Sequence, residues 1–156
     1  MNIKTILFTC ALFIVADYTL SAQADAEKEI LLPIHQLFDG MRAGDSSMVH
    51  AAFHPTARLQ TTFTNKEGNP VVHTADLEKF LVQIGTPHDQ VYDEQIWGYD
   101  VKLEDNLATV WTPYSFYLGE TLLHCGVNAF HVAKTEDGWK IIQITDTRKK
   151  EGCKEK

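Results

Sequence analysis

The residues best suited to chemistry are a histidine, an asparagine, an aspartate and an arginine near the C-terminus: His124, Asn128, Asp146 and Arg148. An imidazole beside a carboxylate in partly apolar surroundings is a setting in which pKa values shift and proton transfer becomes possible. Asp146 and His124 are therefore candidate general bases. The same groups could instead form a structural network in which Asp146 pairs with Arg148 or accepts a hydrogen bond from Asn128.

Two tyrosines on neighbouring predicted strands extend this group into a candidate ligand-binding set. A tyrosine or asparagine could donate hydrogen bonds to a developing oxyanion. Ligand pockets are mostly apolar and contain a few convergent polar groups, so the expected ligand is small and partly apolar. The full candidate set is Tyr99, Tyr114, His124, Asn128, Asp146 and Arg148.

A C-terminal hairpin must position these residues. A three-residue turn over 136–138 pairs Val132 with Ile142 and Phe130 with Ile144, apolar against apolar. One face of this hairpin therefore grades from apolar to polar along its length. Further from the turn, the same register pairs Asn128 with Asp146, Gly126 with Arg148, and His124 with Lys150.

Two more hairpins complete the predicted meander. A turn at residues 105–106 pairs Leu103 with Ala108, within a strand that also carries Trp97, Tyr99 and Val101 on one face. A second turn lies at residues 119–120. In the strand before that turn, Pro113 has no N–H to donate to the ladder and favours a bulge. A bulge would swap the two faces of the strand, so the sequence leaves open which side chains of residues 111–117 point into the concavity.

The N-terminal half reads as helices around a short hairpin. Apolar residues recur at helical spacing from Ile30 to Met41, and Pro33 places the start of the regular helix near Leu32. Asp45 and Thr74 are candidate caps for two further helices, ending at 54–55 and 85. Between those helices, residues 58–64 and 71–72 read as strands.

These elements resemble the nuclear transport factor 2-like superfamily, and are most similar to its secreted bacterial members of the "lumazine-binding" type. The resemblance implies an α+β, cone-shaped fold with N-terminal helices packed in the concavity of a strongly curved antiparallel sheet. Relatives include ketosteroid isomerase, dehydratases and cyclases beside proteins that only bind, so fold alone cannot choose a function. The matching stretches are Phe38-Asp39-Gly40-Met41 with Gly44-Asp45, Ala52-Phe53-His54-Pro55, and Asp137-Gly138-Trp139-Lys140-Ile141-Ile142.

The first 22 residues read as a cleaved secretory signal. Lys4 precedes an apolar run over 6–16, which is too short to span a bilayer, and Ala22 suits signal peptidase. We therefore expect a secreted or periplasmic protein with no membrane attachment after cleavage. The remaining chain divides into a domain over 23–150 and a solvated tail over 151–156.

Two cysteines remain after cleavage, Cys125 and Cys153. In an oxidising compartment an even pair without C-x-x-C spacing reads as a possible disulfide rather than a redox or zinc site, and two free thiols are the alternative. The bridge would close a loop of about 28 residues, worth roughly 3–4 kcal/mol in the chain-entropy model.

Charge and composition narrow the partners. The 14 Lys and Arg against 21 Asp and Glu give a formal charge of −7, which repels phosphate backbones and argues against nucleic-acid binding. His50 and His54 lie four apart but lack a third ligand nearby, so we expect no metal and no cofactor. An apolar outer sheet face with Val127, Ala129, Ile141 and Trp111 predicts a homodimer.

The sequence thus leaves three functions open: a binder of a small ligand in the cone, an isomerase, dehydratase or cyclase that uses Asp146 or His124 as general base, or an interaction module whose cone is filled by side chains.

Overall fold

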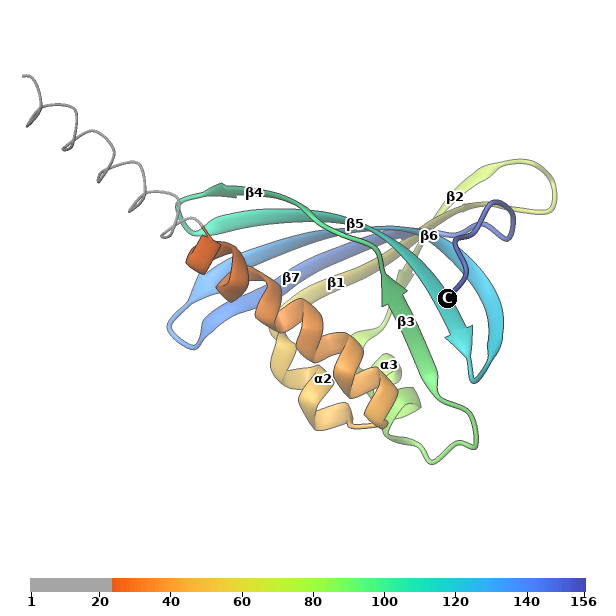
Figure 1. The fold of residues 1–156 in the computed structure, drawn as a ribbon, viewed down its shortest axis with the longest axis horizontal. Helices are drawn as coiled ribbons and strands as arrows, with labels where there is room; N and C mark the ends of the chain where they lie inside the picture. Colours follow the sequence, from red (N-terminus) through yellow and green to blue (C-terminus); the bar gives the residue numbers. More distant parts are fainter. Residues whose placement is uncertain (1–23) are drawn as a thin grey trace, which may run out of the picture.

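A strongly curved sheet holds three helices in its hollow (Figure 1). The computed structural model describes residues 24–156, so the expected signal peptide lies outside the described residues. Within 24–156, no helix is long and apolar enough to cross a membrane. The elements are a first helix over 24–43, α2 (Ser46–Ala52), β1 (Phe53–Thr64), β2 (Pro70–Ala75), α3 (Leu77–Gly85), β3 (Tyr92–Ile96), β4 (Asp100–Glu104), β5 (Leu107–Leu118), β6 (Thr121–Thr135) and β7 (Gly138–Thr147).

The seven strands form one sheet in the order β2-β1-β7-β6-β5-β3, and β4 also pairs with β5. This is the expected α+β cone. The expected all-antiparallel pairing is wrong at one place, because β1 and β7 are parallel. A parallel pair needs a long connection, and here all the intervening elements supply it, so the first and last strands lie at the centre of the sheet.

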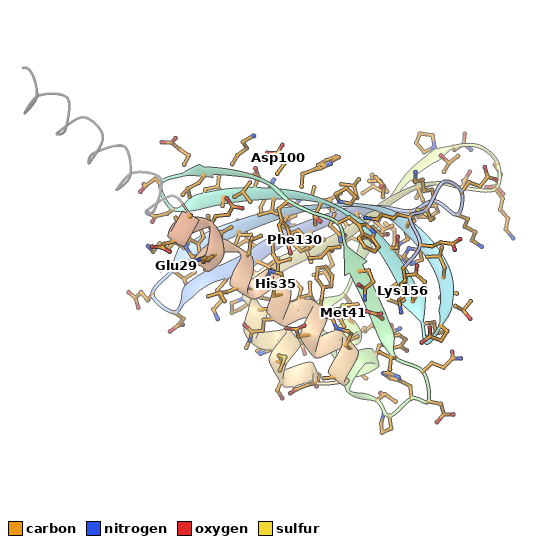
Figure 2. All side chains as sticks on the ribbon, in the orientation of Figure 1. Glu29, His35, Met41, Asp100, Phe130 and Lys156 are labelled. Carbon is orange, nitrogen blue, oxygen red and sulfur yellow. A yellow bond between two sulfur atoms is a disulfide. The ribbon has the colours of Figure 1, made fainter. Side chains whose placement is uncertain are left out.

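The first helix packs one apolar face on the sheet. Ile30, Ile34 and Phe38 are at most 3% exposed, and Phe130 of β6 lies opposite them (Figure 2). The expected start near Leu32 is wrong, because the helix runs through Pro33. A mid-helix proline leaves the carbonyl four residues earlier without its N–H donor. That carbonyl belongs to Glu29, which is exposed, so water can satisfy it.

The two short helices begin at aspartates. Asp45 caps α2 by accepting from the Met48 N–H at 2.9 Å, as expected. The cap of α3 is Asp76, which accepts from the Lys79 N–H at 2.9 Å, and not Thr74. Thr74 instead belongs to β2, where it pairs with Gln60 of the predicted hairpin.

The C-terminal hairpin keeps the predicted register at its polar end only. Phe130 pairs with Ile144 and Asn128 with Asp146, but Val132 pairs with Ile141 rather than Ile142. The turn has two residues instead of the predicted three, because residues 135 and 138 pair. A bulge at Ile142 then shifts the strand by one residue and restores the predicted register beyond it. Because of that bulge Ile141 is fully buried in the core, so its expected place on the outer face is wrong.

The turn at residues 119–120 forms as predicted. The structure also shows which side chains of the Pro113 strand point into the concavity. Pro113 pairs with Val127 without a break, and the bulge lies further along, between Phe116 and Tyr117. Tyr114 therefore points into the concavity and is 2% exposed, whereas Trp111 lies on the convex face and is 54% exposed.

The last residues, 151–156, are mostly exposed, and they are attached to the sheet. Cys153 forms the predicted disulfide with Cys125, with a Cα–Cα distance of 5.5 Å. The Lys154 carbonyl accepts from Ser115 Oγ at 2.6 Å, and Lys156 Nζ lies 2.9 Å from Asp93 Oδ2. The C-terminal segment is thus held against the strands β3 and β5 (Figure 2).

Candidate functional site

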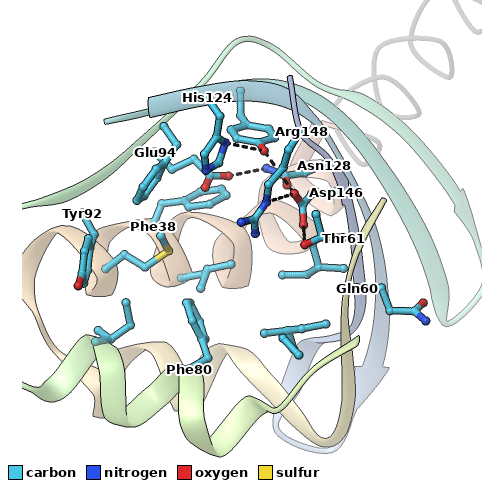
Figure 3. Close-up of a pocket in the computed structure, with 18 of the residues that line it drawn as sticks. Phe38, Gln60, Thr61, Phe80, Tyr92, Glu94, His124, Asn128, Asp146 and Arg148 are labelled. Carbon is cyan, nitrogen blue, oxygen red and sulfur yellow. Dashed lines mark hydrogen bonds and ion pairs between the residues drawn. The ribbon is translucent and has the colours of Figure 1, made fainter. Parts of the chain in front are cut away.

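A cavity of about 260 Å³ lies between the concave face of the sheet and the helices (Figure 3). One part of its wall is apolar, and polar side chains gather at the other. The apolar wall consists of Leu37, Phe38, Met41, Leu59, Phe80, Ile84, Tyr92, Phe116, Phe130 and Ile144, and the polar part includes Thr61, Glu94, Tyr114, His124, Asn128, Asp146 and Arg148.

Asp146, near the end of β7, is the hub of the polar part. Its Oδ1 accepts from Thr61 Oγ1 at 2.6 Å, and its Oδ2 accepts from Arg148 Nε at 2.9 Å and from the Tyr114 hydroxyl at 3.3 Å. The parallel pairing of β1 with β7 brings Thr61 directly beside Asp146. Three donors therefore occupy this carboxylate, as in the structural network that the sequence left open.

Tyr114 joins Asp146 to His124. Its hydroxyl lies 2.9 Å from the Thr147 carbonyl and 3.1 Å from His124 Nδ1. The hydroxyl has one proton for these acceptors; when it goes to the carbonyl or to Asp146, His124 Nδ1 donates to the tyrosine oxygen and Nε2 is left as an acceptor. Gly126 lets the Thr147 carbonyl lie at this position, because a Cβ on residue 126 would lie 1.9 Å from the Thr147 oxygen.

His124 is held neutral. Burial against the cavity wall, together with the nearby charge of Arg148, lowers its pKa to about 4. Its ring stacks on Phe116 at a centroid distance of 5.1 Å. At neutral pH this residue is an uncharged acceptor and a weak base.

Glu94 is a site residue that the sequence reasoning missed. It lies on β3 and reaches into the cavity, where Oε1 accepts from Asn128 Nδ2 at 2.7 Å (Figure 3). Burial raises its pKa to about 7, and the charge of Asp146 adds to this rise. A carboxyl group poised near pH 7 can both take and release a proton.

β3 was missed because it shows no alternation of apolar and polar residues. Asp93 faces the other side of the sheet, where Gln95 Nε2 donates to it at 2.7 Å, so polar side chains occupy both faces. The sequence feature that could have pointed to Glu94 is a carboxylate within a short segment that begins and ends with Tyr92 and Ile96, two residues suited to strands.

Tyr99 stands apart from the other candidates. Gly98, at φ +82°, breaks the expected continuous strand between β3 and β4. Tyr99 is 37% exposed and its hydroxyl lies 3.3 Å from His35 Nε2, outside the cavity lining. The structure thus brings together five of the six predicted ligand-binding residues: Tyr114, His124, Asn128, Asp146 and Arg148.

The histidine pair considered for a metal does not share a helical face. α2 ends at Ala52, so His54 lies on β1, where its Nδ1 contacts Thr56 Oγ1 at 2.8 Å. Among residues 24–156 no three His, Cys, Asp or Glu side chains are grouped to hold a metal ion.

Comparison with known proteins supports the architecture. The sequence matches no family model and no curated protein. Its structure is similar to that of a protein of unknown function from Mycobacterium tuberculosis, with a TM-score of 0.67 and 10% identity over 84% of this chain and 76% of that one.

Two further similar structures carry the fold's name. One is an NTF2-like protein with a cystatin-like fold from Novosphingobium aromaticivorans, with a TM-score of 0.63 and 12% identity over 86% of this chain and 90% of that one. The other, from Streptomyces avermitilis, is named as a candidate dehydratase of the NTF2-like family, with a TM-score of 0.61 and 13% identity over 81% of this chain and 99% of that one. The chain therefore has the cone fold of the nuclear transport factor 2-like proteins.

Proposed function

We propose that the protein binds a compact, partly apolar small molecule in its cone cavity. The observation that carries this proposal is an unfilled cavity whose wall is apolar around Phe38 and Phe130 and polar around Asp146. Its volume of about 260 Å³ lies just below the usual range of small-molecule pockets, about 300–1,000 Å³. The cavity also argues against the third possibility, a cone filled by side chains.

Native mass spectrometry of the exported protein, purified without denaturation, tests this directly. A bound small molecule should be released on unfolding, and it should be lost from an Ala75→Trp variant, which narrows the mouth of the cavity. Val72→Trp is the matched control, because Val72 lies on the same strand, is 63% exposed and does not line the cavity. A ligand-free protein that also binds nothing from a fragment library would refute the proposal.

A second candidate function is proton-transfer catalysis of the isomerase, dehydratase or cyclase type. Glu94 favours it more than the bases expected from the sequence, because its pKa of about 7 suits a general base. Asp146 is occupied by three donors, and His124 is a weak base. The neighbour named as a candidate dehydratase is consistent with this class of reaction.

Exchange of α-hydrogens in D₂O, followed by NMR for carbonyl compounds that bind, separates the two functions. An enzyme should lose about 10²-fold or more of its exchange rate on Glu94→Gln while affinity stays within about twofold. The wild-type rate should rise as pH increases through about 7, where Glu94 loses its proton. A pure binder shows no exchange above the rate in buffer.

We further propose that the protein is secreted or periplasmic, as in the "lumazine-binding" type that its sequence resembles. The disulfide between Cys125 and Cys153 supports this, since such bonds persist in oxidising compartments. Intact-mass analysis of the exported protein should show a chain that begins at residue 23 and contains no alkylatable thiol. A chain that keeps its first 22 residues, or two free thiols, would contradict the proposal.

We also propose a homodimer formed through the convex face of the sheet. Trp111 is 54% exposed there, and Val127 and Ala129 are half-buried beside it. The C-terminal segment covers the other end of this face, so the dimer would use only the Trp111 end. Light scattering at micromolar concentration should give the mass of two chains, and Trp111→Glu should give the mass of one.

A further inference from the structure

We propose that the ligand carries an anionic oxygen group, such as a carboxylate, and that Arg148 binds this group at the mouth of the cavity. This inference rests on the proposed binding function and specifies the chemistry of its ligand. It follows from the hydrogen bonds of Arg148 and from the charges around the mouth.

Within the described part of the chain, the Arg148 side chain uses only one of its donors. Its Nε donates to Asp146 Oδ2 at 2.9 Å, and within residues 24–156 neither terminal nitrogen has a hydrogen-bond acceptor. The guanidinium extends into the open part of the cavity (Figure 3). The side chain is 51% exposed, so solvent or a ligand can reach those terminal nitrogens. Arginine presents its N–H groups as a planar fork that matches a carboxylate or phosphate.

Asp146 fixes this orientation without using the fork. Because the carboxylate binds Nε, the guanidinium is held in place while both terminal nitrogens remain free. Asp146 is in turn held by Thr61 and Tyr114. The arrangement therefore resembles a prepared anion-binding group rather than a closed ion pair.

The space outside the cavity mouth is also cationic. A wider hollow of about 920 Å³ adjoins the cavity. The two share the lining residues Thr61, Ala75, Phe80, Gln83, His124 and Arg148. Among residues 24–156, the cationic side chains of this hollow are Lys79, Arg148, Lys149 and Lys150, and its only carboxylate is Asp76.

Asp76 is committed to the cap of α3, where it accepts from the Lys79 N–H. Asp76 keeps its negative charge there, but four cationic side chains outnumber it, so the hollow is a positive region on a protein whose formal charge is −7. Such a region concentrates anions at the mouth of a cleft and speeds their association.

Below about pH 7 the interior does not oppose an anion, because Glu94 is then largely protonated. Asp146 carries a paired charge, and Glu94, held by Asn128, is the other carboxyl group of the cavity. An amphipathic acid could place its anionic end on Arg148 and its apolar body against Phe130, Phe38 and Ile144. A cationic ligand would be repelled by the Arg148 guanidinium and by the lysines at the mouth.

Matched pairs of compounds test this with isothermal titration calorimetry on the wild-type protein. Benzoic acid, naphthoic acid and decanoic acid are each compared with their neutral amides, and naphthyl phosphate with naphthol. In at least one pair the anion should bind about tenfold or more tighter than its neutral partner at low salt, as a charge-assisted hydrogen bond allows. The phosphate arm shows whether the group is a carboxylate or a phosphate ester.

Three variants show whether Arg148 is responsible. Arg148→Gln should remove the preference for the anion, and Arg148→Lys should keep part of it, because a lysine retains the charge but lacks the fork. Asp146→Asn should instead increase anion affinity a few-fold, since the amide oxygen can still accept from Nε while the negative charge is gone. Opposite effects of neighbouring substitutions would not arise from general loss of structure, which circular dichroism checks separately.

A double variant tests the outer hollow. Lys79→Gln with Lys150→Gln should slow association of the anion several-fold and reduce its salt dependence, with a smaller effect on dissociation. Lys28→Gln with Lys102→Gln is the matched control, because both lysines are more than 70% exposed and lie outside the hollow. This control should leave the association rate within about twofold.

The outcomes separate this inference from the proposed function. If neutral and anionic partners bind equally well, or if Arg148→Gln leaves the preference intact, the inference fails and the binding function stands. If no compound of either kind binds the wild-type protein and none co-purifies with it, both fail.

Discussion

Two carboxyl groups on the wall of one cavity have different surroundings. Asp146 accepts hydrogen bonds from a threonine, a tyrosine and an arginine, whereas Glu94 accepts a single bond from the amide of Asn128. Burial raises the pKa of Glu94 to about 7 because one neutral donor does not replace the water that the carboxylate loses.

The difference follows from the strands that carry the two residues. Asp146 lies near the end of an inner strand, and its donors come from Thr61 of β1, Tyr114 of β5 and Arg148 just after β7. Glu94 lies on the edge strand β3, which has only β5 as a neighbour in the sheet and places Phe116 opposite it. The elements around the two residues thus bring three donors to Asp146 and one to Glu94.

The largest expected effect comes from breaking the hub. Asp146→Ala leaves Thr61, Tyr114 and Arg148 without their shared acceptor inside the cavity, which we expect to cost about 3 kcal/mol of unfolding free energy. Urea denaturation at pH 7 measures it. Asp137→Ala, at an exposed turn, is the control and should change stability by less than about 0.5 kcal/mol. Equal effects of the two substitutions would show that Asp146 is not a hub.

Glu94→Gln should have the opposite sign at alkaline pH. The folded pKa of Glu94, about 7, lies above its ordinary value of 4.5, so its contribution to stability is lost as pH rises through about 7. Glutamine keeps the acceptor for Asn128 but cannot ionise. We expect the variant to be about 2 kcal/mol more stable than the wild type at about pH 8 and nearly equal to it below about pH 4.5. A constant difference across this range would contradict the shifted pKa.

His124 should make the fold sensitive to acid. Its folded pKa of about 4 lies below the ordinary 6.5, so its contribution to stability is present above pH 6.5 and is lost as pH falls towards 4. Solvent reaches the cavity and weakens this effect. We therefore expect the free energy of unfolding to fall by about 1 kcal/mol less in His124→Gln than in the wild type as pH falls from 6.5 to about 4. Glu94 changes stability in the opposite direction over part of this range, so Glu94→Gln should steepen the loss in acid. Denaturation midpoints at several pH values test both slopes.

Tyr99→Phe gives the smallest expected effect. Its hydroxyl meets only His35 at the surface, outside the cavity, so stability should change by no more than about 0.5 kcal/mol and ligand affinity by less than about twofold. Tyr114→Phe is the matched comparison, since the same atom is lost from inside the polar cluster. A larger loss of ligand affinity for Tyr99→Phe than for Tyr114→Phe would show that Tyr99 belongs to the binding site after all.

Much of the polar cluster was predictable from the sequence. The pairing of Phe130 with Ile144 followed from matching apolar residues around a turn, and it placed Asn128 opposite Asp146 correctly. The register survived an error in turn length because a bulge at Ile142 compensates for it. The error is visible between the turn and the bulge, where Ile141 lies in the core rather than on the outer face.

Glu94 and Tyr99 were not predictable in the same way. β3 is an edge strand with polar residues on both faces, so no periodicity marks Glu94, and Gly98 ends the pattern that placed Tyr99 beside the site. The contacts that determine their roles join residues distant in the chain, such as Glu94 with Asn128. Local spacing contains no information about such pairs.

The sequence alone determined the apolar helix face and the turns at 105–106 and 119–120, because these depend on periodicity and turn residues, and it left the cysteine pair open between a disulfide and two free thiols. Only the tertiary structure decided which carboxyl group remains poised near neutral pH and which is held in an ion pair. The reason is that a pKa depends on burial and on donors supplied by other strands, and the parallel pairing of β1 with β7 brings Thr61 to Asp146 but no equivalent donor to Glu94.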